Sequence, residues 1–324
     1  MTHEIGLARP SSDQQVRRLW QHVSLLRPSH WSKSLIAIPI GPVLMIGDAT
    51  GPGLLVLAGT ITMFSLASAA VYVVNDLSDI ERDRAHPSKR NRPLASGVVT
   101  PQAALWMLAG LLTALTLLAI VLPALLTVIV VLYLLCNLSY SFWLKHVPIV
   151  EMLIVPAGFA LRTVSGYVAF GVVPDPWVIA TVLSGSLLLT VGKRRDELRR
   201  VKTSADHRPV LRHYSEPLLD AYLLVAAVAC LGTGLATMIQ FFDALDQRVL
   251  FFISLPFAVY LFKRYLLLAF AGTGTGNPTR LLLSDRTIHV AFVVWALVLG
   301  SSALLDSFGT FDGITALQTA HAAH

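Results

Sequence analysis

Apolar runs of about 20 residues recur along nearly the whole chain, with short polar stretches between them. A helix of this length crosses the roughly 30 Å hydrocarbon core of a bilayer, where only helices and closed barrels satisfy every backbone polar group. The residues are 55% hydrophobic and 14% charged, whereas soluble domains carry about 25% charged residues. The sequence therefore predicts an all-α, polytopic membrane protein.

We expect nine membrane-spanning helices in a single domain that covers residues 34–306. A polar, basic and amphipathic lead-in, residues 1–33, precedes this domain, and a short tail, residues 307–324, follows it. No internal repeat or low-complexity linker divides the chain. The expected spans are residues 34–46, 54–74, 103–122, 125–143 and 148–170, a sixth that follows the turn at 174–177 and ends at 192, and then 218–241, 249–265 and 287–305.

Basic residues lie almost entirely on one side of this predicted topology. The side that holds the N-terminus and every second loop contains 23 of the 25 lysines and arginines. Because short cytoplasmic loops collect Lys and Arg, we expect this side to be cytoplasmic and the C-terminus to lie outside the cell membrane. The basic residues are interleaved with spans rather than gathered in a domain, so nucleic-acid binding is not expected.

Residues 75–97, NDLSDIERDRAHPSKRNRPLASG, carry most of the readable chemistry and follow the second expected span. Asn75, Asp76, Asp79 and Asp83 recur at spacings of three and four, which places them on one face if the segment is helical. Four oxygen donors of this kind suit Mg²⁺. A charged loop that only sets topology is the alternative, but carboxylates this close repel one another unless a cation is bound. We therefore predict that these four residues form a magnesium site.

Basic side chains accompany and follow these carboxylates. Arg82, Lys89 and Arg92 lie within the same segment and fit the non-bridging oxygens of a phosphate ester. The segment as a whole is therefore expected to bind magnesium and a diphosphate together, on the cytoplasmic side of the membrane.

A second polar loop is expected at residues 193–216, after the sixth span. It opens with Lys193 and Arg194, and Glu197 is one of only two acidic residues near its start. A second metal site needs more carboxylates than these, because hard cations are held by several oxygen ligands. We therefore expect this loop to hold an anion directly.

Polar residues in or beside other spans complete the candidates. Tyr140 and Lys145 lie at the cytoplasmic mouth after the fourth span, where a tyrosine is either a membrane anchor or part of a site. Lys33 ends the lead-in. Arg162 lies in the middle of the fifth span, where an arginine costs about 2.5 to 3.5 kcal/mol unless it faces the bundle interior. A partner or a polar cavity is therefore expected around Arg162.

Three other classes of membrane protein fit the sequence less well. A phosphotransferase of the CDP-alcohol type also uses several aspartates near a span end, but its dense Asp-Gly, Ala-Arg and Gly pattern does not occur in this sequence. A secondary transporter would show paired halves with broken helices at the midplane, and the sequence shows no such symmetry. A purely structural membrane protein leaves the aspartate cluster unexplained.

The segment of residues 75–97 resembles the first aspartate-rich motif of the UbiA superfamily of membrane prenyltransferases. The stretches RPSHWSK, YSFWLKH, GFALRTVSG, GKRRDEL, RPVLRHYS and PTRLLLSDR resemble the decaprenyl-phosphate phosphoribosyltransferase branch of that superfamily. The match covers nearly the whole chain. This resemblance implies nine helices around a cavity that opens to the cytoplasm and sideways to lipid.

The resemblance also implies a reaction and a set of site residues. The reaction is Mg²⁺-dependent transfer of 5-phosphoribose from phosphoribosyl diphosphate (PRPP) to a polyprenyl (decaprenyl) phosphate, with release of diphosphate, which in this branch supplies arabinose donors for envelope glycans. A UbiA-type enzyme that moves a prenyl group from a prenyl diphosphate to an aromatic acceptor is the alternative. The basic second loop favours the first reaction, because it suits an acceptor that is itself a phosphate. Oligomerisation through lipid-facing helices fits the sequence, which does not set the number of copies.

Each candidate residue receives a role in that reaction. The catalytic residues are Asp76, Asp79, Asp83 and Lys193, and the metal ligands are Asn75, Asp76, Asp79 and Asp83. The substrate-binding residues are Lys33, Asn75, Arg82, Lys89, Arg92, Tyr140, Lys145, Arg162, Arg194 and Glu197.

Overall fold

The structure is a computed structural model of the 324-residue chain. It describes residues 21–28, 31–40, 52–86, 89–201, 209–241, 245–272 and 285–307. Predictions on most of the lead-in, the end of the first span, the middle of the second polar loop, the connection before the last span and the tail lie outside these ranges. Every regular element in the described ranges is helical, which confirms the all-α class.

Eight long helices account for most of the described residues. Seven of them are long and apolar enough to cross a membrane, and the last, α13, is apolar over Arg286–Trp295. The predicted first span is represented by the six-residue helix α2 (Ser32–Ala37), and residues 41–46 of that span lie outside the described ranges. The count of nine spans therefore stays a prediction. The long helices are α4 (Pro52–Ser78), α6 (Pro101–Val121), α7 (Ala124–Phe142), α8 (Val150–Ala169), α9 (Pro176–Val201), α10 (Glu216–Phe241), α11 (Leu245–Ala271) and α13 (Arg286–Ser307).

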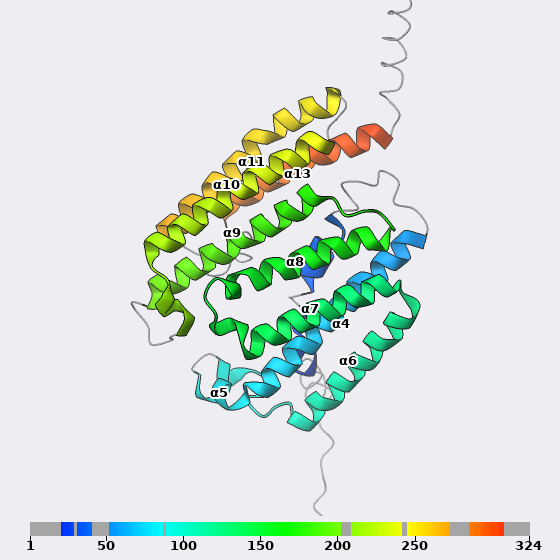
Figure 1. Cartoon of the computed structure of the whole chain (residues 1–324), viewed down its shortest axis with the longest axis vertical. Coiled ribbons are helices and arrows are strands. Elements are labelled where there is room, and N and C mark those ends of the chain that lie inside the picture. Colours follow the sequence, from blue (N-terminus) through cyan, green and yellow to red (C-terminus); the bar gives the residue numbers. More distant parts are fainter. Residues whose placement is uncertain are drawn as a thin grey trace, which may run out of the picture.

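The long helices run side by side in two groups that meet at α8 and α9 (Figure 1). α4, α6, α7 and α8 form one group, and α9 packs on α10 in the other, next to α11 and α13. Buried apolar side chains fill each group, including Phe64 and Ile129 in the first and Leu188 and Leu223 in the second. Because α8 contacts α2, α4, α7 and α9, its polar residues lie where several helices meet.

Local signals set the boundary between residues 75–97, which we call the acidic segment, and α6. The Thr100 side chain accepts a hydrogen bond from the Ala103 backbone N–H at 3.2 Å, and Pro101 occupies the first turn of the helix. Both residue types are favoured at these positions, because the cap satisfies an orphan donor and proline has no N–H to lose. The helix therefore begins two residues before the predicted span of residues 103–122.

α9 is longer than the sequence predicted. The sixth span was expected to end at Gly192 and to give way to a polar loop, but the helix continues to Val201. Ion pairs at helical spacing stabilise the extension, because Lys193 and Arg194 both lie within ion-pair distance of Glu197. The prediction of a loop at residues 193–201 was therefore wrong, and these charged residues extend from a rigid helix.

The acidic segment is not one continuous helix. α4 ends at Ser78, Asp79 has a non-helical backbone (φ −106°, ψ 9°), and a separate helix, α5 (Ile80–Ala85), follows. The Ser78 hydroxyl donates to the Asn75 carbonyl at 2.9 Å and so competes with the backbone ladder at this point. The single helical face that the residue spacing indicated is therefore interrupted. A short 3₁₀ helix, η2 (Lys89–Asn91), completes the segment.

Candidate active site

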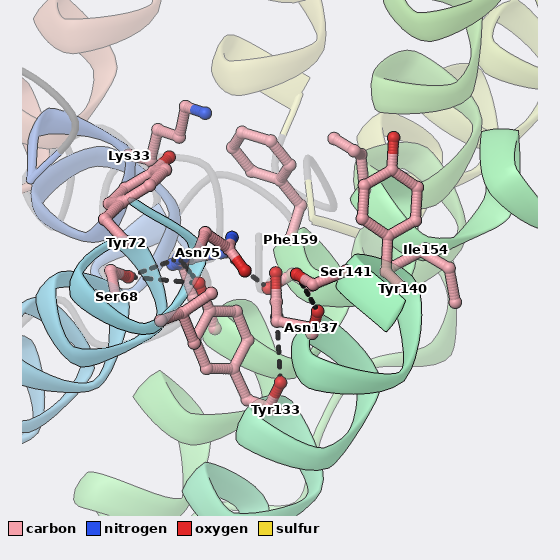
Figure 2. Close-up of a pocket in the computed structure, with 14 residues that line it drawn as sticks. Lys33, Ser68, Tyr72, Asn75, Tyr133, Asn137, Tyr140, Ser141, Ile154 and Phe159 are labelled. Atoms are coloured by element: carbon pink, nitrogen blue, oxygen red, sulfur yellow. Dashed lines mark hydrogen bonds between the residues drawn. The ribbon is translucent and has the colours of Figure 1, made fainter. Parts of the chain in front are cut away.

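A cavity of about 180 Å³ lies between α2, α4, α7 and α8 (Figure 2). α4 and α7 both present polar side chains to it at the spacing i, i+4, i+7, which keeps each set on one helix face. These side chains are Ser68, Tyr72 and Asn75 from α4 and Tyr133, Asn137 and Tyr140 from α7. Apolar side chains of α8, such as Val155 and Phe159, line another part of the wall. The cavity wall thus combines polar and apolar side chains.

Arg162 of α8 lies on the cavity wall and is only 5% exposed. Its guanidinium donates to the hydroxyls of Tyr133 at 2.8 Å and Ser68 at 3.0 Å. It also donates to the Ser34 hydroxyl at 3.2 Å and the Gly158 carbonyl at 3.0 Å. Within the described part of the chain, no carboxylate lies within ion-pair distance of Arg162. The predicted polar surroundings are confirmed, and they leave a buried positive charge without a neutralising acid.

Lys33 of α2 adds a second positive charge to the same wall (Figure 2). Burial, together with the positive charges of Arg162 and Lys193, lowers the pKa of Lys33 to about 8. Desolvation and like charges both disfavour the protonated amine, and a bound anion would reverse the second effect. The cavity therefore favours an anionic ligand.

Asn75 and Asp76 lie side by side near the end of α4. Asn75 lines the cavity, and its Oδ1 is buried without a hydrogen-bond partner among the described residues. Asp76 is 3% exposed and accepts hydrogen bonds from Arg27 Nη2 at 2.6 Å and Arg92 Nη1 at 3.2 Å. A buried amide oxygen without a donor beside a buried carboxylate fits Mg²⁺, which proteins often bind through one or two carboxylates plus water and substrate phosphates.

Arg92 links this pair of residues to α5. Its Nη1 also donates to Asp83 Oδ2 at 2.7 Å, so Asp76 and Asp83 contact the same guanidinium nitrogen. Asp79 pairs instead with the exposed Arg82 at 3.0 Å. Across the described ranges, no three or more His, Cys, Asp or Glu side chains gather in a metal-binding group. Two of the three predicted aspartates are therefore brought together, whereas Asp79 is held separately.

Two predicted lysines lie near the site without lining the cavity. The backbone N–H of Lys89, in η2, donates to His86 Nδ1 at 3.3 Å. Lys145 lies in the 3₁₀ helix η3 (Leu144–His146), which contacts η4 (Pro209–His213). η4, from the second half of the predicted polar loop, therefore packs against the 3₁₀ helix that directly follows α7.

Arg194 of α9 forms a closed ion-pair network. Its Nε and Nη2 each donate to one carboxylate oxygen of Glu151 at 2.6 Å, and its Nη1 donates to Glu197 at 2.6 Å. Arg194 is 4% exposed and Glu151 is fully buried. Carboxylates thus occupy all three guanidinium nitrogens, where the sequence predicted a contact with a substrate anion. The Arg194–Glu151 pair therefore joins α9 to α8, and Glu197 contacts the same guanidinium from within α9.

Lys193 differs from its neighbour, because its side chain is 45% exposed and its Nζ lies 3.9 Å from Glu197. It is also close enough to Lys33 to lower the pKa of that lysine. Lys193 therefore adds to the positive potential at the Lys33 side of the cavity.

Five residues of the site are not among the candidates that the sequence predicted: Arg27, Ser68, Tyr72, Tyr133 and Asn137. Four of them carry a readable signal, because they belong to the polar i, i+4, i+7 sets within otherwise apolar spans. Arg27 carries no such signal. It reaches Asp76 across 49 residues of chain, and only the folded structure brings the two together.

Comparison with known proteins places this geometry in a family. The UbiA prenyltransferase family matches over residues 34–284. A decaprenyl-phosphate phosphoribosyltransferase of Mycolicibacterium smegmatis is 30% identical over 315 residues, which cover 93% of this chain and 98% of the relative. An enzyme of the same name from Mycobacterium tuberculosis is 31% identical over 287 residues, covering 86% of this chain and 93% of the relative.

A solved structure shows the same fold at low sequence identity. A UbiA homologue from Archaeoglobus fulgidus bound to DMAPP and Mg²⁺ superposes with a TM-score of 0.63 at 13% identity, over 86% of this chain and 96% of that chain. The seven apolar helices and the family match together indicate an integral membrane protein. The chain belongs to the UbiA prenyltransferase family.

Proposed function

We propose that the protein transfers 5-phosphoribose from PRPP to a polyprenyl phosphate and releases diphosphate. The cavity beside Asn75 and Asp76 carries this proposal. Its wall combines two cations, Lys33 and Arg162, with seven neutral hydroxyl and amide side chains. The mycobacterial relatives are named for the same activity on decaprenyl phosphate, so the chain length of the lipid is proposed to be similar.

The character of the cavity supports a sugar donor over a prenyl donor. A pentose phosphate presents hydroxyl groups and a doubly charged phosphate, which match amide, phenol and guanidinium partners. An isoprenoid chain presents only carbon and hydrogen, and sites for such ligands are lined mainly by apolar side chains. Lys33 and Arg162 are therefore proposed to bind a phosphate of the donor, and Asn75 and Tyr140 to contact its sugar.

Asn75, Asp76, Asp79 and Asp83 are proposed to bind the metal ion. When bound, Mg²⁺ neutralises charge on the diphosphate leaving group. The orphaned Asn75 oxygen and the buried Asp76 carboxylate support this assignment. Asp79 has to leave Arg82 to join the ligand set.

Basic residues of the acidic segment are proposed to complete the diphosphate site. Arg92 already contacts two of the aspartates, and Arg82 and Lys89 lie in the same segment. Guanidinium groups bind phosphate oxygens through paired hydrogen bonds, which adds directional stabilisation to the charge that develops on the leaving group.

The acceptor phosphate is proposed to lie near Lys193, with Lys145 and Tyr140 beside it. A phosphate monoester is already an anionic nucleophile at neutral pH, so the protein has to align it with the anomeric carbon rather than remove a proton. Arg194 and Glu197 support Lys193 by holding the α9 extension in place. Positioning and charge stabilisation supply the rate in this proposal.

The acidic segment and the α9 extension are proposed to face the cytoplasm. In support, 23 of the 25 lysines and arginines fall on that side of a nine-span topology. Residues 1–33 then form a cytoplasmic lead-in, residues 34–306 the UbiA-like membrane domain and residues 307–324 an external tail. Cysteine-accessibility labelling of intact cells at an exposed position of each loop tests this orientation.

A two-donor assay tests the proposed reaction. Membranes that contain the protein are incubated with labelled PRPP plus decaprenyl phosphate, and separately with a prenyl diphosphate plus 4-hydroxybenzoate. We expect label to enter the lipid fraction only in the first reaction, and to be lost when EDTA removes the metal. Product in the second reaction alone would establish the aromatic prenyltransferase instead.

A further inference from the structure

Arg27 belongs to the described end of the lead-in and reaches across to α4. Its Nη2 donates to Asp76 Oδ1 at 2.6 Å, and its Cζ lies 4.5 Å from the centroid of the Tyr72 ring. The nearby Leu25 is fully buried in a cluster with α4 residues, so this part of the lead-in is packed onto the protein. Arg27 itself has φ +48°, a left-handed conformation that non-glycine residues rarely adopt. The contacts therefore hold Arg27 in place against its backbone preference.

Arg27 and Arg92 share the neutralisation of Asp76 unequally. Arg92 contacts both Asp76 and Asp83, and thereby joins α4 to α5. Arg27 contacts Asp76 alone among the carboxylates of the described residues. Asp76 is nearly inaccessible to solvent, and a buried carboxylate requires a compensating charge at all times. Arg27 is therefore the counter-charge of Asp76 that can be replaced without separating α4 from α5.

We propose that Arg27 is an exchangeable counter-ion of Asp76. It neutralises the carboxylate in the substrate-free site, competes there with a divalent cation, and on displacement binds a phosphoryl oxygen of the donor. Its stacking on Tyr72, which lines the cavity, keeps the displaced guanidinium next to the phosphate site. The proposal rests on the proposed function for the identity of the donor, but the competition with a cation does not depend on it.

Metal binding to the substrate-free protein tests the competition. Mn²⁺ is titrated into the detergent-solubilised full chain and followed by electron paramagnetic resonance. We expect Arg27→Gln to lower the Kd for Mn²⁺ by about tenfold, the effect that one charge at this distance has on a carboxylate equilibrium, and Arg27→Lys to stay near the unmodified protein. Arg264→Gln is the matched control, because Arg264 is a partly exposed arginine that pairs with Asp285 at 2.9 Å between α11 and α13.

The Michaelis constant for Mg·PRPP tests the second half of the proposal. We expect Arg27→Gln to raise it by about tenfold, while Arg264→Gln leaves it unchanged, with thermal unfolding reported for every variant. Unchanged or weaker Mn²⁺ binding in Arg27→Gln would overturn the competition, and would make Arg27 only a support for Asp76. Tighter Mn²⁺ binding with an unchanged Michaelis constant would overturn the transfer of Arg27 to the donor. Because the Mn²⁺ titration contains no donor, its result stands even if the two-donor assay shows a different reaction.

Discussion

The charged segments at the ends of α4 and α9 are built in opposite ways. After α4, buried carboxylates lie at the centre, and Arg27 and Arg92, with side chains 24% and 32% exposed, reach them from outside. In α9 the buried guanidinium of Arg194 lies at the centre, held by Glu151 and Glu197. The first arrangement allows its partly exposed cations to exchange with other ligands. The second does not, because removing either buried partner leaves an unpaired charge away from water.

This contrast teaches that the composition of a charged segment does not by itself reveal its role. Both segments mix acids and bases at helical spacing, and both lie at the C-terminal end of a long apolar helix. The chemical role depends on which sign of charge is buried and on whether its partners are accessible. We therefore expect substitutions at the end of α4 to affect catalysis and substitutions around Arg194 to affect folding.

The largest expected effect is the loss of Asp76. Asp76→Ala should lower kcat/KM for transfer by about 10³-fold or more, because it removes both a metal ligand and stabilisation of the leaving group. Asp83→Ala should lower kcat/KM by a similar factor. Both variants should stay folded in detergent, since neither residue belongs to an apolar core. Label transfer from PRPP and thermal unfolding measure the two effects.

Glu81→Gln is the control for these variants, because Glu81 lies in the same segment with an 85% exposed side chain. Its transfer rate should match that of the unmodified protein. Near-normal turnover of Asp76→Ala in the presence of Mg²⁺ would exclude the acidic segment from the mechanism. It would also contradict the functional contrast between the ends of α4 and α9.

Glu151→Gln should have the next largest effect, and on stability rather than chemistry. The substitution leaves the Arg194 guanidinium buried without its bidentate partner, which should cost about 3 kcal/mol in the free energy of unfolding. Denaturant titration in detergent measures this loss. The double variant Glu151→Leu with Arg194→Leu should recover most of it, because no charge then remains buried.

A Glu151→Gln protein that is stable but has a raised Michaelis constant for either substrate would contradict this assignment. Arg194 would then bind substrate, as the sequence alone suggested, and the two charged segments would serve the same purpose.

Lys193→Ala should have a smaller effect, on substrate binding rather than on stability. Its side chain is partly exposed, so its removal should leave stability nearly unchanged and raise the Michaelis constant of one phosphate-bearing substrate by about tenfold. Steady-state kinetics with PRPP and decaprenyl phosphate varied in turn identifies which one. Lys263→Ala, at an exposed lysine of α11, is the control. Unchanged Michaelis constants for both substrates would show that Lys193 contributes positive charge to α9 without contacting either substrate.

The smallest expected effect is a pH dependence that originates at Lys33. Because its pKa in the folded protein is about 8, Lys33 is a cation below that pH and loses its charge above it. The Michaelis constant for PRPP should therefore rise about threefold between pH 7 and pH 9.5, a modest change because Arg162 supplies a second positive charge to the same cavity wall. Lys33→Arg should abolish this rise. A Lys33→Arg profile that parallels the unmodified one would assign the pH dependence to another group.

The lowered pKa of Lys33 also makes the stability of the folded protein depend on pH. The folded-state pKa of Lys33 lies below its ordinary value of 10.5, so between about pH 8 and pH 10.5 the unfolded chain binds more protons than the folded one. Stability therefore increases with pH across that window. A phosphate ion bound in the cavity should reduce this dependence, since it favours the protonated amine.

The sequence predicted the fold class and the positions of most long helices, because apolar runs and proline caps are local signals. It also predicted polar surroundings for Arg162, which the structure confirms, whereas the magnesium site at Asn75 and Asp76 stays a prediction. It predicted the end of α9 wrongly, since nothing local distinguishes a charged loop from a charged helix that leaves the membrane. Ion pairs at i, i+3 and i, i+4 and packing against α8 make that difference.

Long-range pairing was the other feature beyond prediction. The sequence suggested that Arg194 holds a substrate anion, but Glu151, 43 residues away, accepts hydrogen bonds from two of its three guanidinium nitrogens. Arg27 and Asp76 are separated still further along the chain. Composition near either residue does not indicate such partners, because they come together only when helices pack.

The two buried charges of α8 differ in when their partners are synthesised. The hydroxyl groups that bind Arg162 belong to α2, α4 and α7, which all precede α8 along the chain. Glu151 depends on Arg194 of α9, which follows. Since domains emerge from the ribosome N-terminal end first, Arg162 meets its partners as soon as α8 joins the bundle, whereas the Arg194 guanidinium reaches Glu151 only when the next helix arrives. Insertion of α9 is therefore the step of biosynthesis that brings the Arg194 guanidinium to Glu151.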